Sequence, residues 1–388
     1  PTLVSSELVP APAAPEIMKP RGRGCVIMQR AAASGRVCNS PRSAMTDVFD
    51  MEISRLLCPL DELGGDVQDG TLFLKDSGSF VYAEGYWHPP GRFYGKVIDY
   101  PCETGSALVH GRRYESLTKR REGGVRVLVP HDAQMEMLRR IEPGLPIPEP
   151  RPVVTAYHYP FELSRMRGWF SGPKSMLAAM ERFPETGRRI REIAALLGLP
   201  IERLGVAGPL AYGCEDEDGA LGIVIRGTPE ENMETALRVR RLAYADPARR
   251  CVEYGKFWPL RLLHDGVAVS CFFVYSDRSS IPVRGQEISP VRAPVELFGT
   301  VVDSLHSLYM PVVLRLGDAY LDGAAAGEID LVIADSSIRG EFYPNERVHV
   351  SRGRLVRLAG GASAAEAVVA VDAGDVEKER FVKGVPAF

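Results

Sequence analysis

The sequence lacks the features that would mark a membrane, secreted or zinc-binding protein. No apolar run approaches the roughly 20 residues that a membrane-spanning helix needs. The seven cysteines form no Cys-x-x-Cys pair, so their spacing contains no zinc or redox motif. An odd number of cysteines without an apolar secretory segment favours a reducing compartment. We therefore expect a cytoplasmic protein with no membrane partner.

An excess of either charge is also missing. The 47 lysines and arginines nearly balance the 50 aspartates and glutamates, which gives a net charge of −3. This balance excludes a nucleic-acid binder that is basic over its whole surface, but it leaves a local basic face open. The 388 residues are 45% hydrophobic and 25% charged, which is typical of a globular protein with two or three domains of about 100–200 residues each.

Composition and residue patterns divide the chain around its middle into five segments. Residues 1–45 are rich in Pro, Ala, Ser and Arg without a helix or strand period, so we expect a disordered tail. Short strand patterns and turn residues predict a small β-rich module over residues 51–142, and six prolines predict a linker over residues 143–160. Five further short strands predict a barrel-like β module over residues 291–358, and residues 359–388 have no assignment.

The middle segment, residues 161–290, contains helix signals. Apolar residues recur with a helical period over residues 190–197. Thr228 and Pro229 open another predicted helix, because Thr is a good N-cap and Pro suits the first turn. Ser175 is a plausible N-cap of a third helix.

Strand signals in the same segment complete its expected architecture. Residues 221–225 and 267–275 are rich in β-branched and aromatic side chains and therefore predict strands. We expect residues 190–275 to form a mixed sheet flanked by helices, with residues 221–225 as a central strand. The predicted fold class is thus α+β, with a mostly β module on either side of the mixed sheet.

The most informative stretch is the approach to this central strand. Gly208-Pro209 and Gly213 precede it, and Ala220 and Gly222, two residues apart, point to the same face of a strand. This pattern resembles the signature of the nucleotidyltransferase domain of the DNA polymerase beta superfamily. In that signature a Gly-Ser pair opens a short helix, and the following strand presents Asp-apolar-Asp. The resemblance implies that Gly208, Pro209 and Gly213 occupy nucleotide-binding positions.

The chemistry of that signature explains what is missing here. The glycine lets the backbone approach a triphosphate, whose oxygens the serine and the helix N-terminus bind. Two carboxylates on the strand and a third on its neighbour hold two Mg²⁺ ions. In this chain Pro209 replaces the serine, Ala220 and Gly222 replace both aspartates, and residues 267–275 contain no carboxylate. We expect no bound metal, no metal-dependent catalysis, and binding of a nucleotide, a nucleic acid or a protein partner.

Two other interpretations remain open. Asp216 and Asp218, in the acidic run 215–218, could replace the lost pair and hold Mg²⁺ in an active nucleotidyltransferase. A run of charges in a loop is more often solvated surface, which argues against this reading. Alternatively, the chain is a structural or assembly subunit in which the two β modules make the functional contacts.

Two short motifs widen the resemblance to archaeal proteins that carry a nucleotidyltransferase domain between β modules. The first motif comprises Gly85, Tyr86, His88, Pro89, Pro90 and Arg92, and the second comprises Val302, Asp303, Ser304, Tyr309 and Pro311. His88 and Arg92 are further candidate site residues. A hydrogen-bonded structural role for the histidine and an ion pair for the arginine are the favoured interpretations. If the β module predicted over residues 291–358 is a barrel of the oligonucleotide-binding type, that topology does not by itself imply nucleic-acid binding.

Overall fold

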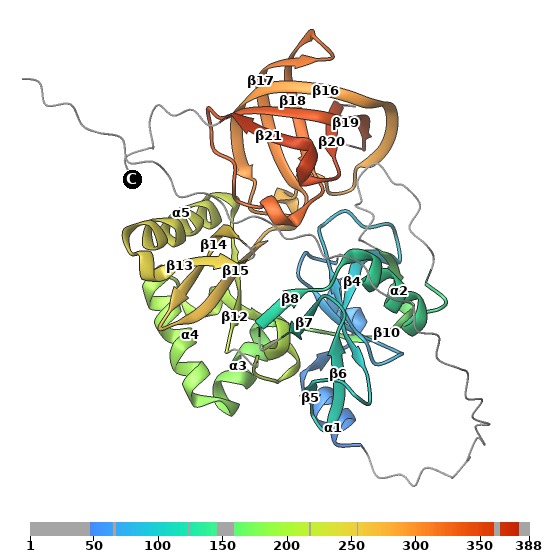
Figure 1. The fold of residues 1–388 in the computed structure, drawn as a ribbon, viewed down its shortest axis with the longest axis vertical. Helices are drawn as coiled ribbons and strands as arrows, with labels where there is room; N and C mark the ends of the chain where they lie inside the picture. The colour runs from blue at the N-terminus through green and yellow to red at the C-terminus, as the bar shows by residue number, and fades with distance from the viewer. Residues whose placement is uncertain are drawn as a thin grey trace, which may run out of the picture. The chain divides into compact units, whose positions relative to one another are not determined.

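The computed structural model describes residues 47–64, 67–122, 125–145, 159–216, 219–253, 255–360 and 365–379. They belong to one compact unit. The predicted tail, residues 1–45, lies outside the described residues, as does most of the predicted linker, residues 143–160. Helices and mixed sheets make up the described chain (Figure 1), so the predicted α+β class is confirmed. None of the helices in these ranges has both the length and the apolar character needed to span a bilayer.

An eight-stranded sheet is the basis of the N-terminal module. Its strands follow the order β1-β10-β2-β3-β4-β6-β5, and β9 pairs with β4. Stacked rings of Phe73, Phe93 and Phe161 fill its core, with centroids 4.4 Å apart for the first two and 5.6 Å for the last two. The strands of this sheet are β1 (Leu57–Cys58), β2 (Leu72–Lys75), β3 (Phe80–Ala83), β4 (Arg92–Pro101), β5 (Ala107–Val109), β6 (Arg112–Ser116), β9 (Tyr159–Glu162) and β10 (Met166–Phe170). The module also contains α1 (Val48–Leu56), α2 (His131–Ile141) and a hairpin of β7 (Lys119–Glu122) and β8 (Val125–Leu128).

The extent of this module differs from the one predicted. The predicted combination of short strands and turns is present near Gly78, where β2 and β3 pair antiparallel on either side of a turn. The module does not end at residue 142, however, since β9 and β10 return to the same sheet after α2. β10 pairs with both β1 and β2, so the N-terminal module extends to Phe170. The sequence pattern of a strand does not identify its distant partner, which is why this return was missed.

The central sheet has the predicted mixed topology. Its order is β11-β12-β15-β14-β13, with β12 parallel to β15 and the other pairs antiparallel. The strand predicted at residues 221–225 is β12, which lies inside the sheet. The strands are β11 (Leu204–Ala207), β12 (Leu221–Gly227), β13 (Arg250–Glu253), β14 (Lys256–His264) and β15 (Val267–Tyr275). The helices of this domain are α3 (Gly172–Arg182), α4 (Pro184–Leu197) and α5 (Pro229–Ala245).

One of the two predicted helix caps is correct. Thr228 caps α5 in a capping box, in which its hydroxyl accepts from the Glu231 N–H and the Glu231 carboxylate accepts from the Thr228 N–H. Ser175 does not cap α3, which begins three residues earlier with Ser171 as N-cap and Pro173 in its first turn. The Ser175 hydroxyl is buried and donates to the Ala211 carbonyl at 2.7 Å.

Six strands form the C-terminal module, which is a closed barrel. β16 pairs with both β17 and β19, β18 pairs parallel with β20, and β20 pairs with β19, so the sheet returns to its first strand. The strands are β16 (Glu287–His306), β17 (Val312–Leu321), β18 (Ala324–Ile333), β19 (Arg347–Ala359), β20 (Ala365–Ala370) and β21 (Val376–Glu379).

The barrel extends beyond the predicted boundary at residue 358. Residues 359–388, which had no assignment, contribute β20 and β21. Two of the five short strands predicted over residues 291–358, at residues 348–350 and 355–358, are the two halves of β19. The polar residues between them resemble a turn in the sequence, but Gly353 lets the strand pass Val368 closely, since a Cβ there would lie 2.5 Å from its Cγ1.

Candidate functional site

The side chains of β12 alternate between two different environments. Ile223 and Ile225 are buried in the core that the sheet forms with α4 and α5. Gly222, Val224 and Arg226 point to the opposite face, since successive residues of a strand alternate. This second face is the one on which the superfamily signature would place its carboxylates.

Gly222, one of the two positions at which an aspartate was sought, lies on that second face, whereas Ala220, the other, directly precedes β12. The cross-strand neighbours of Gly222 are Ala207 on β11 and Ser270 on β15. None of the strands β11, β12 and β15 contains an aspartate or a glutamate. A Cβ on Gly222 would lie 3.1 Å from the Ala207 carbonyl oxygen, so the backbone of β11 occupies the space that a longer side chain would need.

The glycines before β12 shape a short 3-10 helix, η4 (Gly208–Tyr212). Gly208 opens η4 with a φ of +67° and Gly213 ends it with a φ of +81°, a region that favours glycine. A Cβ on Gly213 would lie 2.7 Å from Leu56 Cδ1, and the ring of Tyr212 stacks on Phe80 at 4.1 Å. Pro209, which was predicted at a nucleotide-binding position, has no backbone N–H and therefore cannot donate a hydrogen bond from its main chain. This loop therefore packs against the N-terminal module. The left-handed backbone and the close contact with Leu56 explain why residue 213 is a glycine.

The acidic run after η4 lies close to another carboxyl group. Asp216 is half-buried, whereas Asp218 lies outside the described residues. The Tyr212 hydroxyl donates to Asp99 at 3.1 Å. Burial, together with the negative charge of Asp216, raises the pKa of Asp99 to about 6, although hydrogen bonds from Tyr212 and Ser116 lower it. Asp99, on β4, was not predicted as a neighbour of this run.

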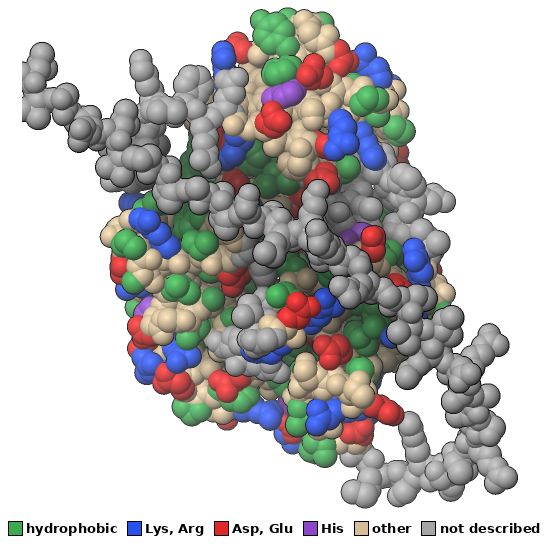
Figure 2. Space-filling view, viewed as in Figure 1, with side chains coloured by type: hydrophobic (Ala, Val, Ile, Leu, Met, Phe, Trp, Pro, Cys, Tyr) green, Lys and Arg blue, Asp and Glu red, His purple; other side chains and the backbone are tan. Residues whose placement is uncertain are grey.

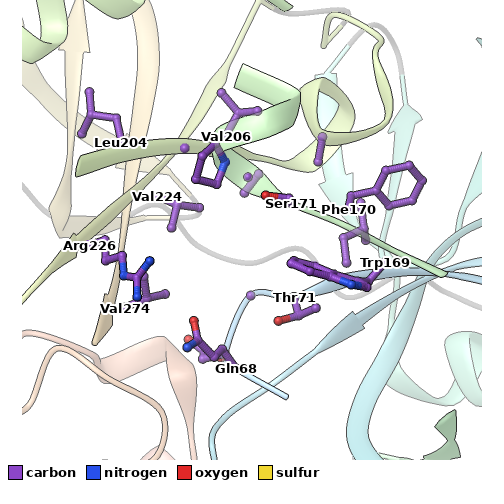
Figure 3. A pocket seen from close by; sticks show the side chains of 18 of the residues that line it. Gln68, Thr71, Trp169, Phe170, Ser171, Leu204, Val206, Val224, Arg226 and Val274 are labelled. Atoms are coloured by element: carbon purple, nitrogen blue, oxygen red, sulfur yellow. The ribbon is translucent and has the colours of Figure 1, made fainter. Parts of the chain in front are cut away.

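A pocket of about 270 Å³ lies beside the second face of the central sheet. It is lined by β2 and β10 of the N-terminal sheet and by β11 and β12 of the central sheet. Figure 3 shows Trp169 and Thr71 on one side and Val224, Arg226 and Val274 on the other. The volume is near the lower end of the range of roughly 300–1,000 Å³ for small-molecule sites. We call it the Trp169–Arg226 pocket.

Three arginines line the Trp169–Arg226 pocket. Arg226 is exposed and donates to the Ser276 carbonyl at 3.1 Å, so its hydrogen-bond partner carries no charge. Arg203 donates to the Arg226 carbonyl at 2.8 Å, and its ion pair, with Glu231, is longer at 3.5 Å. Arg278 donates to a main-chain carbonyl at 3.1 Å.

The acidic side chains of the pocket cancel only part of this charge. Asp69 is buried and pairs with Arg339 at 2.7 Å, so its charge is already balanced. Glu62 and Glu202 are exposed. In addition, the pocket contains the first residues of α3, and the Ser171 side chain makes no capping bond there. The N-terminus of a helix favours negative charge, so the wall near α3 is also suited to an anion.

His88 and Arg92 do not line the Trp169–Arg226 pocket. The Nδ1 atom of His88 accepts the N–H of Tyr94 at 3.2 Å. Arg92 is about half exposed and pairs with Glu162 at 3.1 Å. These contacts agree with the structural interpretation of the histidine and the ion-paired interpretation of the arginine.

The two flanking motifs meet the central sheet at one place. The rings of Tyr275 and Tyr309 stack at 3.7 Å, and Tyr86 contacts both at 5.0 and 6.4 Å. Gly85 lies against the backbone of Met310, where a Cβ would be 3.2 Å from the carbonyl oxygen. One residue from each module thus contributes to a buried tyrosine cluster, and both motifs have a packing role.

Among the described residues, one group has the geometry to hold a metal ion. It comprises Glu192, His264 and Asp265, with His264 Nε2 3.2 Å from the Glu192 carboxylate and 3.9 Å from Asp265. Arg188 already pairs with Glu192, and a cation would have to compete with it. This group lies outside the Trp169–Arg226 pocket.

The pocket as a whole had no signal in the sequence. Arg226 could have been predicted from the sequence, because it continues the i, i+2 series that begins at Ala220 and Gly222. Trp169 could not have been predicted, because its position depends on the return of β10 to the N-terminal sheet. No family model, no curated protein and no solved structure matches this chain.

Proposed function

We propose that this chain is a non-catalytic relative of the nucleotidyltransferases and binds a nucleotide in the Trp169–Arg226 pocket. The observation that carries the proposal is the placement of an indole ring opposite an arginine, beside a sheet face that has no carboxylate. The nucleotidyltransferase relationship rests on the sequence signature around Gly208 and Gly222.

The two ends of the pocket suit the two ends of a nucleotide. Aromatic rings stack on bases with little dependence on base identity, and Trp169 is the ring available here. A guanidinium binds phosphate oxygens through two parallel hydrogen bonds, and Arg226 and Arg203 lie on the opposite wall. The N-terminus of α3, which follows Trp169 and Phe170 in the chain, adds backbone donors to the pocket.

Loss of the carboxylates explains why binding would occur without transfer. Phosphoryl-type transfer depends on positioning and on neutralisation of charge by bound metals. Each ~1.4 kcal/mol of lost transition-state stabilisation reduces the rate tenfold, so removal of the ligands of both ions costs many powers of ten. Magnesium is therefore not required for the proposed binding.

A second candidate function is an active transferase with displaced ligands. Its support is the proximity of Asp216, which follows η4, to Asp99 on β4, which brings two carboxyl groups close together. In this alternative Asp216 and Asp218 hold Mg²⁺, and transfer depends on both.

Calorimetry and thermal melting of the full chain with ATP, GTP, CTP, UTP and AMP, each with and without Mg²⁺, test the binding. A ligand at a hundred times its Kd stabilises the folded state by about 2.7 kcal/mol, which shifts the melting temperature measurably. We expect a shift with at least one nucleotide, and we expect Arg226→Gln and Trp169→Ala to remove it. Arg191→Gln, an exposed arginine on α4, is the matched control. Equal binding by the Arg226→Gln chain, or no binding of any nucleotide, contradicts the proposal.

A further inference from the structure

The outer surface of the C-terminal barrel carries a row of rings. Strand register places Phe298 of β16 directly opposite Tyr320 of β17 on one side and His349 of β19 on the other. Glu377 of β21 continues the row beyond His349. Directly paired residues of neighbouring strands point to the same face of a sheet, so these four side chains share the outside of the barrel. We call them the ring row.

The rings in this row are unusually exposed for large apolar side chains. Phe298 is 42% exposed and Tyr320 is 51% exposed. The rings of Phe298 and His349 stack at 4.1 Å with an angle of 3° between their planes. The barrel has its own buried core on the inner face, so stability of the module does not need these rings outside. Exposed aromatic side chains in register mark a surface that binds something.

Carboxylates lie on both sides of His349 in the ring row, and the exposed Arg347 lies two residues before it on the same face of β19. Glu296 accepts from His349 at 2.9 Å, and Glu377 lies 3.6 Å from the same imidazole. Asp318 and Asp322 lie two residues before and after Tyr320, and Asp322 already pairs with Arg292 at 2.6 Å. Figure 2 shows hydrophobic, acidic and basic side chains near one another on the barrel, at the top of the view.

The charge of the whole barrel has the same sign. Residues 287–379 contain fifteen aspartates and glutamates but only eight lysines and arginines. The net charge of the chain is −3, so the barrel is more negative than the protein as a whole, and the rest of the chain is positive. The phosphates of a nucleic acid would be repelled by the negative charge of this surface. A second copy of the chain would also be repelled, because it would bring the same carboxylates to the interface.

We propose that the ring row docks a basic segment of a partner protein, with arginine side chains stacked on Phe298 and Tyr320. A guanidinium stacks on aromatic faces and pairs with carboxylates through parallel hydrogen bonds, so one side chain uses both features of this surface. Glu296 and Glu377 supply carboxylates at the two ends of the His349 ring. This inference is independent of nucleotide binding in the Trp169–Arg226 pocket.

Fluorescence anisotropy with defined peptides and the full chain tests the proposal. The probes are a labelled peptide of alternating Arg and Gly, its Lys and Glu counterparts, and a labelled single-stranded RNA, all at 0.15 M salt as a roughly physiological ionic strength. The proposal predicts that the Arg peptide binds most tightly and the Glu peptide least. Phe298→Ser/Tyr320→Ser should weaken Arg-peptide binding about tenfold, whereas Val291→Ser, an exposed apolar residue elsewhere on β16, should not.

A second variant keeps the rings and removes charge. Glu296→Gln/Glu377→Gln should also weaken the Arg peptide and should reduce the salt dependence of binding. Melting curves of each variant show whether it is folded. Failure of the Arg peptide to bind at millimolar concentration, or equal binding by the ring variant, overturns the proposal. RNA binding that the ring variant abolishes, or sedimentation showing self-association that it abolishes, also overturns it and identifies a nucleic acid or a second copy as the occupant.

Discussion

Replacement of Gly222 by aspartate tests whether the second face of the central sheet has room for a metal site. Gly222→Asp introduces one carboxylate at a position where the proposed relationship to the nucleotidyltransferases would place it. Its Cβ would lie 3.1 Å from the Ala207 carbonyl oxygen and 3.3 Å from the Ala207 Cβ, closer than most such contacts. Those atoms belong to the paired strand β11 and cannot rotate away, so the two strands must separate locally.

The size of the effect follows from three contributions. Overpacking of a well-packed site costs about 1–3 kcal/mol. Replacement of a glycine within a strand returns roughly 0.5–1 kcal/mol of backbone entropy, and aspartate is one of the less favourable strand residues, by up to about 1 kcal/mol. We therefore expect the free energy of unfolding to fall by about 1–3 kcal/mol, with no increase in stability on addition of Mg²⁺.

Urea unfolding with and without 10 mM Mg²⁺, roughly a saturating concentration for a carboxylate site, measures both expectations. Gly222→Ala is the control that separates crowding from charge, and it should cost nearly as much as the aspartate. A chain with Ala220→Asp/Gly222→Asp that is as stable as the parent and gains stability with Mg²⁺ would refute the reasoning, because the site would then still be shaped for metals.

Three further outcomes follow from the same structure. Gly213→Ala should lower the unfolding free energy by about 1–3 kcal/mol, because φ is +81° and Leu56 Cδ1 lies 2.7 Å from the new Cβ; an unchanged urea midpoint contradicts this. The pKa of Asp99 is about 6 in the folded chain and about 3.9 in the unfolded chain, so the folded chain binds more protons between these pH values. The protonated Asp99 therefore contributes its full stabilisation below about pH 4, and this stabilisation is lost as the pH rises to about 6. Asp99→Asn should therefore gain stability relative to the parent between pH 4 and pH 7, and parallel urea midpoints across that range would argue against the shift. No transfer from labelled nucleoside triphosphates to RNA, DNA or protein is expected with Mg²⁺ or Mn²⁺, and transfer that disappears in Asp216→Asn/Asp218→Asn would establish the displaced-carboxylate alternative.

Local signals in the sequence predicted the elements that local chemistry determines. Thr228 and Glu231 lie three residues apart and form the capping box of α5 without help from distant residues. The run of β-branched and aromatic residues at 267–275 has the same bounds as β15. Alternation along β12 also places Gly222, Val224 and Arg226 on one face, and this follows from the period of a strand alone.

Long-range pairing determines the parts that the sequence did not predict. Ser175 has the chemistry of an N-cap, but Pro173 starts α3 earlier and the serine donates to Ala211 instead. Trp169 reaches the pocket only because β10 lies between β1 and β2. The ring row depends on a register across four strands, which the periodicity within one strand does not determine.

The late return of β10 has a consequence for how the chain is made. Residues 57–75 supply β1 and β2, which are neighbours of the same strand but do not pair with each other. That strand emerges from the ribosome about a hundred residues later, at synthesis rates of roughly 5–20 residues per second. During those seconds both strands have an open edge, which is a site for pairing with other chains. An N-terminal piece that ends before residue 166 therefore lacks the strand that covers the edge of β2, and we expect it to aggregate or to bind chaperones when it is expressed.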